Sequence, residues 1–175
     1  MILVLTGDKG SGKTTLLKRL VTGQGMEIQG FLSLKEMEHG QITGISLMLL
    51  PEQELVPMAT TTPIPTDMCT KRFYFYPGVF EKVNSRFREP RPGPPFVFDE
   101  FGLLEREDGG HYPVFRGLLA ASHPALVVVR SELAGELCAL LDSGSQEYRV
   151  VSLDQDGPQE ALRLVAEFLS TAHGG

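Results

Sequence analysis

The amino-acid sequence predicts an α/β fold with a largely parallel β-sheet and a hairpin beside it. Short apolar runs alternate along the chain with segments of helical periodicity, which is typical of βαβ units. A glycine-rich segment joins the first apolar run, residues 1–5, to the first helical pattern, residues 13–21. Two further apolar runs, 28–34 and 42–50, flank the turn residues His39 and Gly40 and predict the hairpin.

The later elements are predicted from the same signals. A helical pattern begins at a proline, where the missing N–H is harmless, and places Phe80, Val83 and Phe87 on one face. The wholly apolar run 125–129 predicts a buried strand. We therefore expect strands at 72–76, 96–99, 125–129 and 148–153, and helices at 77–87, 112–121, 132–141 and 158–170.

Residues 51–66 are predicted to form a loop. The segment contains four prolines and four threonines, a composition that helix interiors and central strands do not favour. It is interpreted as a surface connection. The alternative is a flap beside a ligand, because long loops in compact domains are often functional.

Length and charge limit the classes of function. A chain of 175 residues, 42% of them hydrophobic, favours a single domain that spans residues 1–175 and buries roughly 70% of the surface of the unfolded chain. The net charge of −6 argues against a nucleic-acid partner, because phosphate backbones are bound by clustered Lys and Arg. No apolar run approaches the length of a membrane span, so we expect no membrane partner and a cytoplasmic location. The sequence leaves the oligomeric state open and is compatible with a monomer.

The segment GDKGSGKTT matches the phosphate-loop pattern GxxxxGK[ST] and stands between a predicted strand and a predicted helix. Glycines let successive N–H groups point at phosphate oxygens, and the helix N-terminus adds partial positive charge. Lysine reaches the β and γ phosphates in such loops, and the first threonine binds Mg²⁺. The alternative is a glycine-rich turn with an exposed lysine. The candidate nucleotide-binding residues are Gly7, Asp8, Lys9, Gly10, Ser11, Gly12, Lys13, Thr14 and Thr15.

A second acidic feature, FVFDEFGLLE, begins at Phe96 and supplies Asp99 and Glu100. A Mg²⁺–triphosphate complex needs an acid near the metal at the end of a neighbouring strand, so Asp99 is a candidate metal ligand, directly or through water. The alternative is a strand-end residue that only faces water. Glu100 then faces the γ phosphate and is a candidate catalytic base for water. Lys13, which reaches the phosphates, is the second catalytic candidate. The alternatives for Glu100 are positioning of the loop and an outer contact to Mg²⁺.

Arginine candidates are less specific. A guanidinium that stabilises the transferring phosphoryl group accelerates such reactions strongly. Arg106 follows the acidic segment and Arg130 ends a predicted buried strand, so both are candidates, and Arg72 is a weaker one. Each also fits a surface or strand-end residue. No NKxD segment is present, so a Ras-like guanine pocket is unsupported.

The motifs resemble a family of small P-loop nucleoside triphosphatases first described from thermophiles. The similarity rests on TGDKGSGKTTLLKRL, on IQGFLSLKE with its acid at Glu36, and on a DEhGxhE segment that ends at Glu105. The resemblance implies a three-layer P-loop fold with a RecA-like sheet, Mg²⁺ dependence, and conversion of ATP, GTP and other nucleoside triphosphates to diphosphate and phosphate. It also makes Glu36 and Glu105 candidate site residues. Two departures stand out: Glu38 replaces an arginine usual in the family, and SLDQDG replaces an Asn-Arg pair.

Three functions are compatible with these motifs. The first is a hydrolase in which Glu100 prepares water. The second is a nucleotide-binding accessory module, similar to the P-loop adaptor of molybdenum-cofactor guanylylation. The third is a small nucleotide or metabolite kinase, in which Glu100 activates an acceptor hydroxyl.

Overall fold

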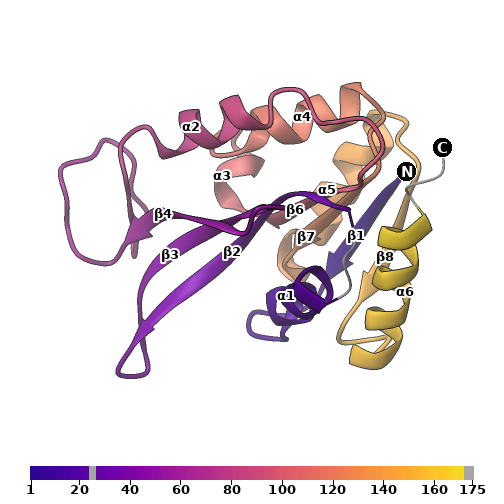
Figure 1. Ribbon diagram of the computed structural model, residues 1–175, viewed down its shortest axis with the longest axis horizontal. Coiled ribbons are helices and arrows are strands. Elements are labelled where there is room, and N and C mark those ends of the chain that lie inside the picture. The colour runs from indigo at the N-terminus through magenta and orange to yellow at the C-terminus, as the bar shows by residue number, and fades with distance from the viewer. Residues whose placement is uncertain (24–26, 172–175) are drawn as a thin grey trace.

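The computed structural model describes residues 1–23 and 27–171, which form an α/β fold in three layers (Figure 1). The strands are β1 (Ile2–Thr6), β2 (Gln29–Glu38), β3 (Gln41–Leu50), β4 (Glu54–Thr60), β5 (Tyr74–Phe75), β6 (Phe96–Phe101), β7 (Ala125–Val129) and β8 (Tyr148–Ser152). The helices are α1 (Lys13–Gly23), α2 (Val79–Arg86), α3 (Leu103–Arg106), α4 (Tyr112–Ala120), α5 (Ser131–Ser143) and α6 (Pro158–Thr171).

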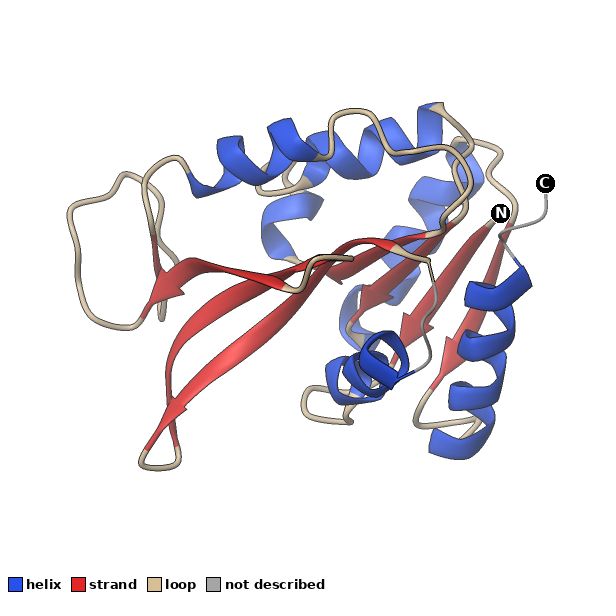
Figure 2. Ribbon diagram, in the orientation of Figure 1, coloured by secondary structure: helices blue, strands red, loops and turns tan. Residues whose placement is uncertain are grey.

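The described strands make one sheet in the order β5-β4-β3-β2-β6-β7-β1-β8 (Figure 2). The strands from β2 to β8 in this order pair in parallel, whereas β3, β4 and β5 add antiparallel pairs on one side. β7 separates the phosphate-loop strand β1 from β6, as in RecA-like sheets. The predicted mixed sheet with an added hairpin is therefore confirmed.

Two apolar cores hold the layers together, one on each face of the sheet. α1 and α6 pack on one face through residues such as Leu17 and Val165. α2, α4 and α5 pack on the other face, with Phe115 and Leu137 fully buried. β7 is buried along its whole length because helices cover both of its faces. The central strands are thus buried on both faces, and their carboxyl ends present the polar residues described below.

The hairpin of β2 and β3 forms as the sequence predicts. His39 and Gly40 connect the strands, with φ values of 49° and 78°. Positive φ at both central residues fits the right-handed twist of the flanking strands. The hairpin extends well beyond the helical layers in Figure 1.

The prediction of a loop across residues 51–66 is wrong, because Glu54–Thr60 form β4. Pro57 pairs with Ser46, and the register of β3 against β4 shifts between Ile45 and Ser46. A strand tolerates proline at such an irregularity, where the regular ladder of hydrogen bonds is already interrupted. The outer neighbour β5 pairs only with Ala59 and Thr60, so β4 also lies near the edge of the sheet.

Two smaller differences concern the acidic segment. The strand predicted to end at Asp99 continues to Phe101, and the short helix α3 follows it at once. A four-residue helix is too short to create a periodic apolar pattern, so the sequence does not signal it.

Within the described part of the chain, no helix has the length and apolar character to cross a membrane.

Candidate active site

The phosphate loop lies between β1 and α1, as its motif predicts. Gly10 and Gly12 have φ values of 86° and 97°, in a region that side chains disfavour. A Cβ at either position would meet nothing within 4 Å, so glycine is needed there for backbone shape rather than for space. Helix α1 begins at Lys13, directly after the turn. Its free N–H groups and dipole make this loop an anion-binding position.

Lys13 lies over the loop and is only 9% exposed. Its Nζ donates hydrogen bonds to the carbonyl oxygens of Gly7 at 2.5 Å and Asp8 at 2.9 Å. Burial lowers the pKa of Lys13, while the charges of Glu100, Asp154 and Asp99 raise it. The ammonium group is thus held at the loop by contacts that a phosphate oxygen can replace.

Asp99 and Thr14 meet across the site. The Thr14 hydroxyl donates to Asp99 Oδ2 at 3.1 Å, and the Ser33 N–H donates to the same oxygen at 3.1 Å. Asp99 is 2% exposed, and burial, followed by the charge of Glu100, raises its pKa to about 7. A buried carboxylate beside a hydroxyl is a set of hard oxygen donors, which is the type that Mg²⁺ binds together with phosphate oxygens. The residues therefore fit the ion that the motif implies.

Glu100 is the extra residue of a β-bulge. Asp99 pairs with Val128 of β7 and Phe101 pairs with Val129, so Glu100 has no partner in this register. The bulge turns Phe101 back to the aromatic core, where its ring lies 5.2 Å from that of Phe115. In a regular strand with no bulge, Phe101 would lie on the same face as Asp99, because side chains two residues apart share a face. The bulge therefore leaves the Glu100 side chain at the strand end, 34% exposed.

The two stronger arginine candidates lie in different environments. Arg130 Nε donates to Glu100 Oε1 at 2.7 Å, so Arg130 stands at the acidic segment. Arg106 instead contacts Glu107 at 3.4 Å and Glu136 at 3.7 Å. Those are exposed surface pairs, which contribute little to stability. Of the two candidates, Arg130 is the one whose guanidinium directly contacts a predicted site residue.

Glu105 fixes the segment that follows Glu100. Its carboxylate accepts the N–H of Gly102 at 3.1 Å and the N–H of His111 at 2.9 Å, and the residue is 5% exposed. Burial raises its pKa, and these two hydrogen bonds act in the opposite direction. Glu105 therefore joins both ends of the α3 segment.

Glu36 lies on the hairpin. Its carboxylate accepts a hydrogen bond from the Ser46 hydroxyl of β3. A Cβ at Gly44 would come within 2.7 Å of Glu36 Oε2, so the small residue leaves room for the carboxylate. This contact supports the hairpin rather than the phosphate loop.

Sequence reasoning missed the residues that anchor the phosphate loop from outside. The N–H of Asp8 donates to Asp154 Oδ2 at 2.8 Å, and the Ser131 hydroxyl donates to the Asp8 carboxylate. Asp154 and Ser131 follow β8 and β7, the strands on either side of β1. Because parallel strands end at one edge of a sheet, polar residues just after each strand are the signal that points to this edge.

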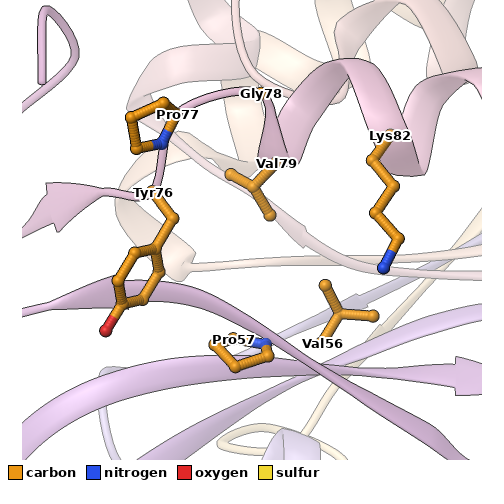
Figure 3. A pocket seen from close by; sticks show the side chains of 7 residues that line it. All are labelled: Val56, Pro57, Tyr76, Pro77, Gly78, Val79 and Lys82. Atoms are coloured by element: carbon orange, nitrogen blue, oxygen red, sulfur yellow. The ribbon is translucent and has the colours of Figure 1, made fainter.

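A recess on the surface is separate from these residues. It has a volume of about 480 Å³ and lies between β4 and the start of α2, lined by Tyr76, Val79 and Lys82 among others (Figure 3). Four strands of the sheet separate β4 from β1. The recess therefore has no part in the phosphate-loop site.

The fold and the loop together define a P-loop nucleotide-binding protein, and comparison with known proteins defines its family. The family model described as NTPase matches residues 2–162. The chain belongs to this family of P-loop nucleoside triphosphatases, which confirms the resemblance inferred from the motifs.

The relatives that were found agree with this assignment. Nucleoside-triphosphatase THEP1 of Metallosphaera sedula is 26% identical over 132 residues, which are 75% of this chain and 72% of the relative. The crystal structure of THEP1 from the hyperthermophile Aquifex aeolicus has a TM-score of 0.72 at 17% identity, covering 97% of this chain and 99% of that one. The solution structure of a human cancer-related nucleoside triphosphatase has a TM-score of 0.65 at 18% identity, covering 97% of each chain. At these identities, the structural matches establish the fold.

Proposed function

We propose that this chain is a Mg²⁺-dependent phosphohydrolase that converts a nucleoside triphosphate and water to the diphosphate and phosphate. ATP and GTP are the expected substrates, with broad tolerance of the base. The observation that carries the proposal is the hydrogen bond between Thr14 and Asp99, which joins the phosphate loop to the acidic strand. It brings oxygen donors for a cation next to the phosphate cradle, with Glu100 as the following residue.

Each site residue has a distinct role in this proposal. The N–H groups of residues 7–15 bind the β and γ phosphates, and Lys13 neutralises charge that develops on them. Thr14 and Asp99 would hold Mg²⁺, which would supply further charge neutralisation at the phosphate oxygens. These contacts hold the terminal phosphate in a fixed position for attack in line with the leaving group.

Glu100 is the proposed general base. Its carboxylate accepts a proton from water as the water oxygen bonds to the γ phosphorus and the bond to the β–γ bridging oxygen breaks. The bridging oxygen leaves as part of the nucleoside diphosphate. The partial exposure of Glu100 supports this role, because the base has to reach a water molecule.

Phosphate release from a panel of nucleoside triphosphates tests the proposal. We expect release with Mg²⁺, without an acceptor molecule, and little release when the metal is chelated. Thr14→Val should lower the response to Mg²⁺, while Thr22→Val, which removes an exposed helix hydroxyl bonded to Lys18 O, should not. Tight binding without release would indicate an accessory module instead. Turnover that depends on an acceptor would indicate a kinase.

A further inference from the structure

The proposed base Glu100 is paired with a cation. Arg130 Nε lies 2.7 Å from Glu100 Oε1, and the two side chains are 37% and 34% exposed. A second contact joins Arg130 Nη1 to Glu132 at 3.8 Å, at the start of α5. A carboxylate that accepts a hydrogen bond from a guanidinium, and whose charge that guanidinium neutralises, is a poorer acceptor for a proton from water. The pair therefore has to open, or to change its geometry, for Glu100 to act as a base.

The arginine is carried by backbone that is attached to the phosphate loop. The next residue, Ser131, donates its N–H to the carbonyl of Gly7 at 3.2 Å and its hydroxyl to the carboxylate of Asp8. The same Gly7 carbonyl accepts a hydrogen bond from Lys13. The backbone of Arg130 is thus held next to the phosphate loop. Only the long side chain has to move for the guanidinium to reach a different acceptor.

The chemistry favours exchange of partners. A guanidinium presents five N–H donors in a planar fork and binds phosphate oxygens in pairs. A partly exposed ion pair such as the one between Arg130 and Glu100 is weak. A terminal phosphate carries more negative charge than one carboxylate, so it competes well for the same guanidinium. A nucleoside diphosphate has no γ phosphate.

We propose that Arg130 is a latch on Glu100 that the terminal phosphate of a nucleoside triphosphate releases. The guanidinium transfers from the carboxylate to the γ-phosphate oxygens, which positions the phosphate and leaves Glu100 free to accept the proton of water. The latch distinguishes triphosphate from diphosphate before any bond is broken. This inference rests on the proposed function, because it assigns Glu100 as the base.

The test is a double-mutant cycle on binding, measured without turnover. The probes are the β,γ-methylene analogues of ATP and GTP, compared with ADP and GDP, all with Mg²⁺ in isothermal titration. Arg130→Gln should reduce the preference for triphosphate over diphosphate by at least about tenfold. Glu100→Gln should tighten analogue binding by about two- to fivefold, because the competing ion pair is gone. In the Arg130→Gln background, Glu100→Gln should leave the affinity for the analogues unchanged.

Controls separate the latch from simpler effects. Arg163→Gln removes another arginine that is paired with two glutamates, on α6, and should leave both affinities unchanged. Arg130→Lys keeps the charge and should retain part of the triphosphate preference, and thermal unfolding verifies that each variant is folded. If Glu100→Gln tightens analogue binding equally with and without Arg130, charge repulsion alone explains the result and the latch is rejected. Unchanged preference in Arg130→Gln also rejects it.

Failure of the latch can be distinguished from failure of the proposed function. The cycle uses analogues that the protein does not hydrolyse, whereas phosphate release from the wild type tests hydrolysis. Release that persists in Glu100→Gln would reject the base assignment even if the binding cycle were as expected. A failed cycle with normal release and a Glu100-dependent rate would reject the latch alone.

Discussion

His111 should make the fold less stable in mild acid. It is 3% exposed and lies between Phe31 and Phe80, with ring centroids 4.7 Å and 4.9 Å away. Asn84 donates through Nδ2 to Gly110 O, so its Oδ1 accepts from Nδ1 of the imidazole at 2.8 Å. Among the described residues, no group hydrogen-bonds the buried Nε2, the atom that would take up a proton.

The size of the effect follows from the pKa. Burial lowers the pKa of His111 from 6.5 to about 3. The unfolded state binds the proton more tightly than the folded state. The contribution of His111 to the free energy of unfolding is therefore fully present above the unfolded pKa, and it is lost as the pH falls towards the folded pKa. At about pH 5 the loss is about 2 kcal/mol relative to about pH 7.5. Asp99 acts in the opposite direction, because its pKa is raised to about 7, so the wild-type profile alone does not isolate His111.

His111→Gln isolates the contribution, since glutamine can still donate to Asn84 but takes up no proton. Urea unfolding of wild type and variant at the two pH values should show the variant gaining about 2 kcal/mol relative to wild type at the lower pH. Val114→Ala, a buried change that removes no titrating group, should cost the same at both pH values. A difference between His111→Gln and wild type that does not vary with pH would refute the reasoning.

Three further predictions concern the site. Asp99→Asn should weaken Mg²⁺-dependent nucleotide binding in calorimetry, yet raise the free energy of unfolding above pH 7 by up to about 4 kcal/mol, because a buried carboxylate is removed. Glu105→Gln should cost about 1–3 kcal/mol in urea unfolding and slow phosphate release while nucleotide affinity is kept. Gly12→Ala should weaken triphosphate binding by at least about tenfold, since it strains the left-handed backbone by about 1–2 kcal/mol. Each prediction is contradicted if the affinity, free energy of unfolding or rate that it names is the same in the variant as in the wild type.

The local parts of the site were predictable from the sequence. The phosphate loop, Lys13 and Thr14 follow from one contiguous motif whose flanking strand and helix are also readable. Asp99 is predicted near the metal because a Mg²⁺–triphosphate complex needs an acid at the end of a neighbouring strand, and the structure places its carboxylate within hydrogen-bond distance of Thr14. The hairpin was predicted because its turn residues and both apolar runs lie close together in the chain.

The parts that depend on contacts between distant segments were not predictable. The bulge at Glu100 exists only in the pairing of β6 with β7, and the contact with Arg130 requires the order of those strands. The low tolerance of strands for proline is a property of a single segment and argues against a strand at residues 54–60. The irregular register with β3, which accommodates Pro57, depends on a second segment. Asp154 was passed over because its partner, the N–H of Asp8, lies 146 residues away.

The central claim is that Glu100 accepts the proton of the attacking water. The most direct measurement is the rate of phosphate release by Glu100→Gln at saturating nucleoside triphosphate and Mg²⁺, with nucleotide binding measured on the same preparation. We predict a rate at least about 100-fold below wild type, because loss of a general base costs about 10² to 10⁴ in rate, with nucleotide binding retained. A variant that binds nucleotide and releases phosphate within a few-fold of the wild-type rate would contradict the claim.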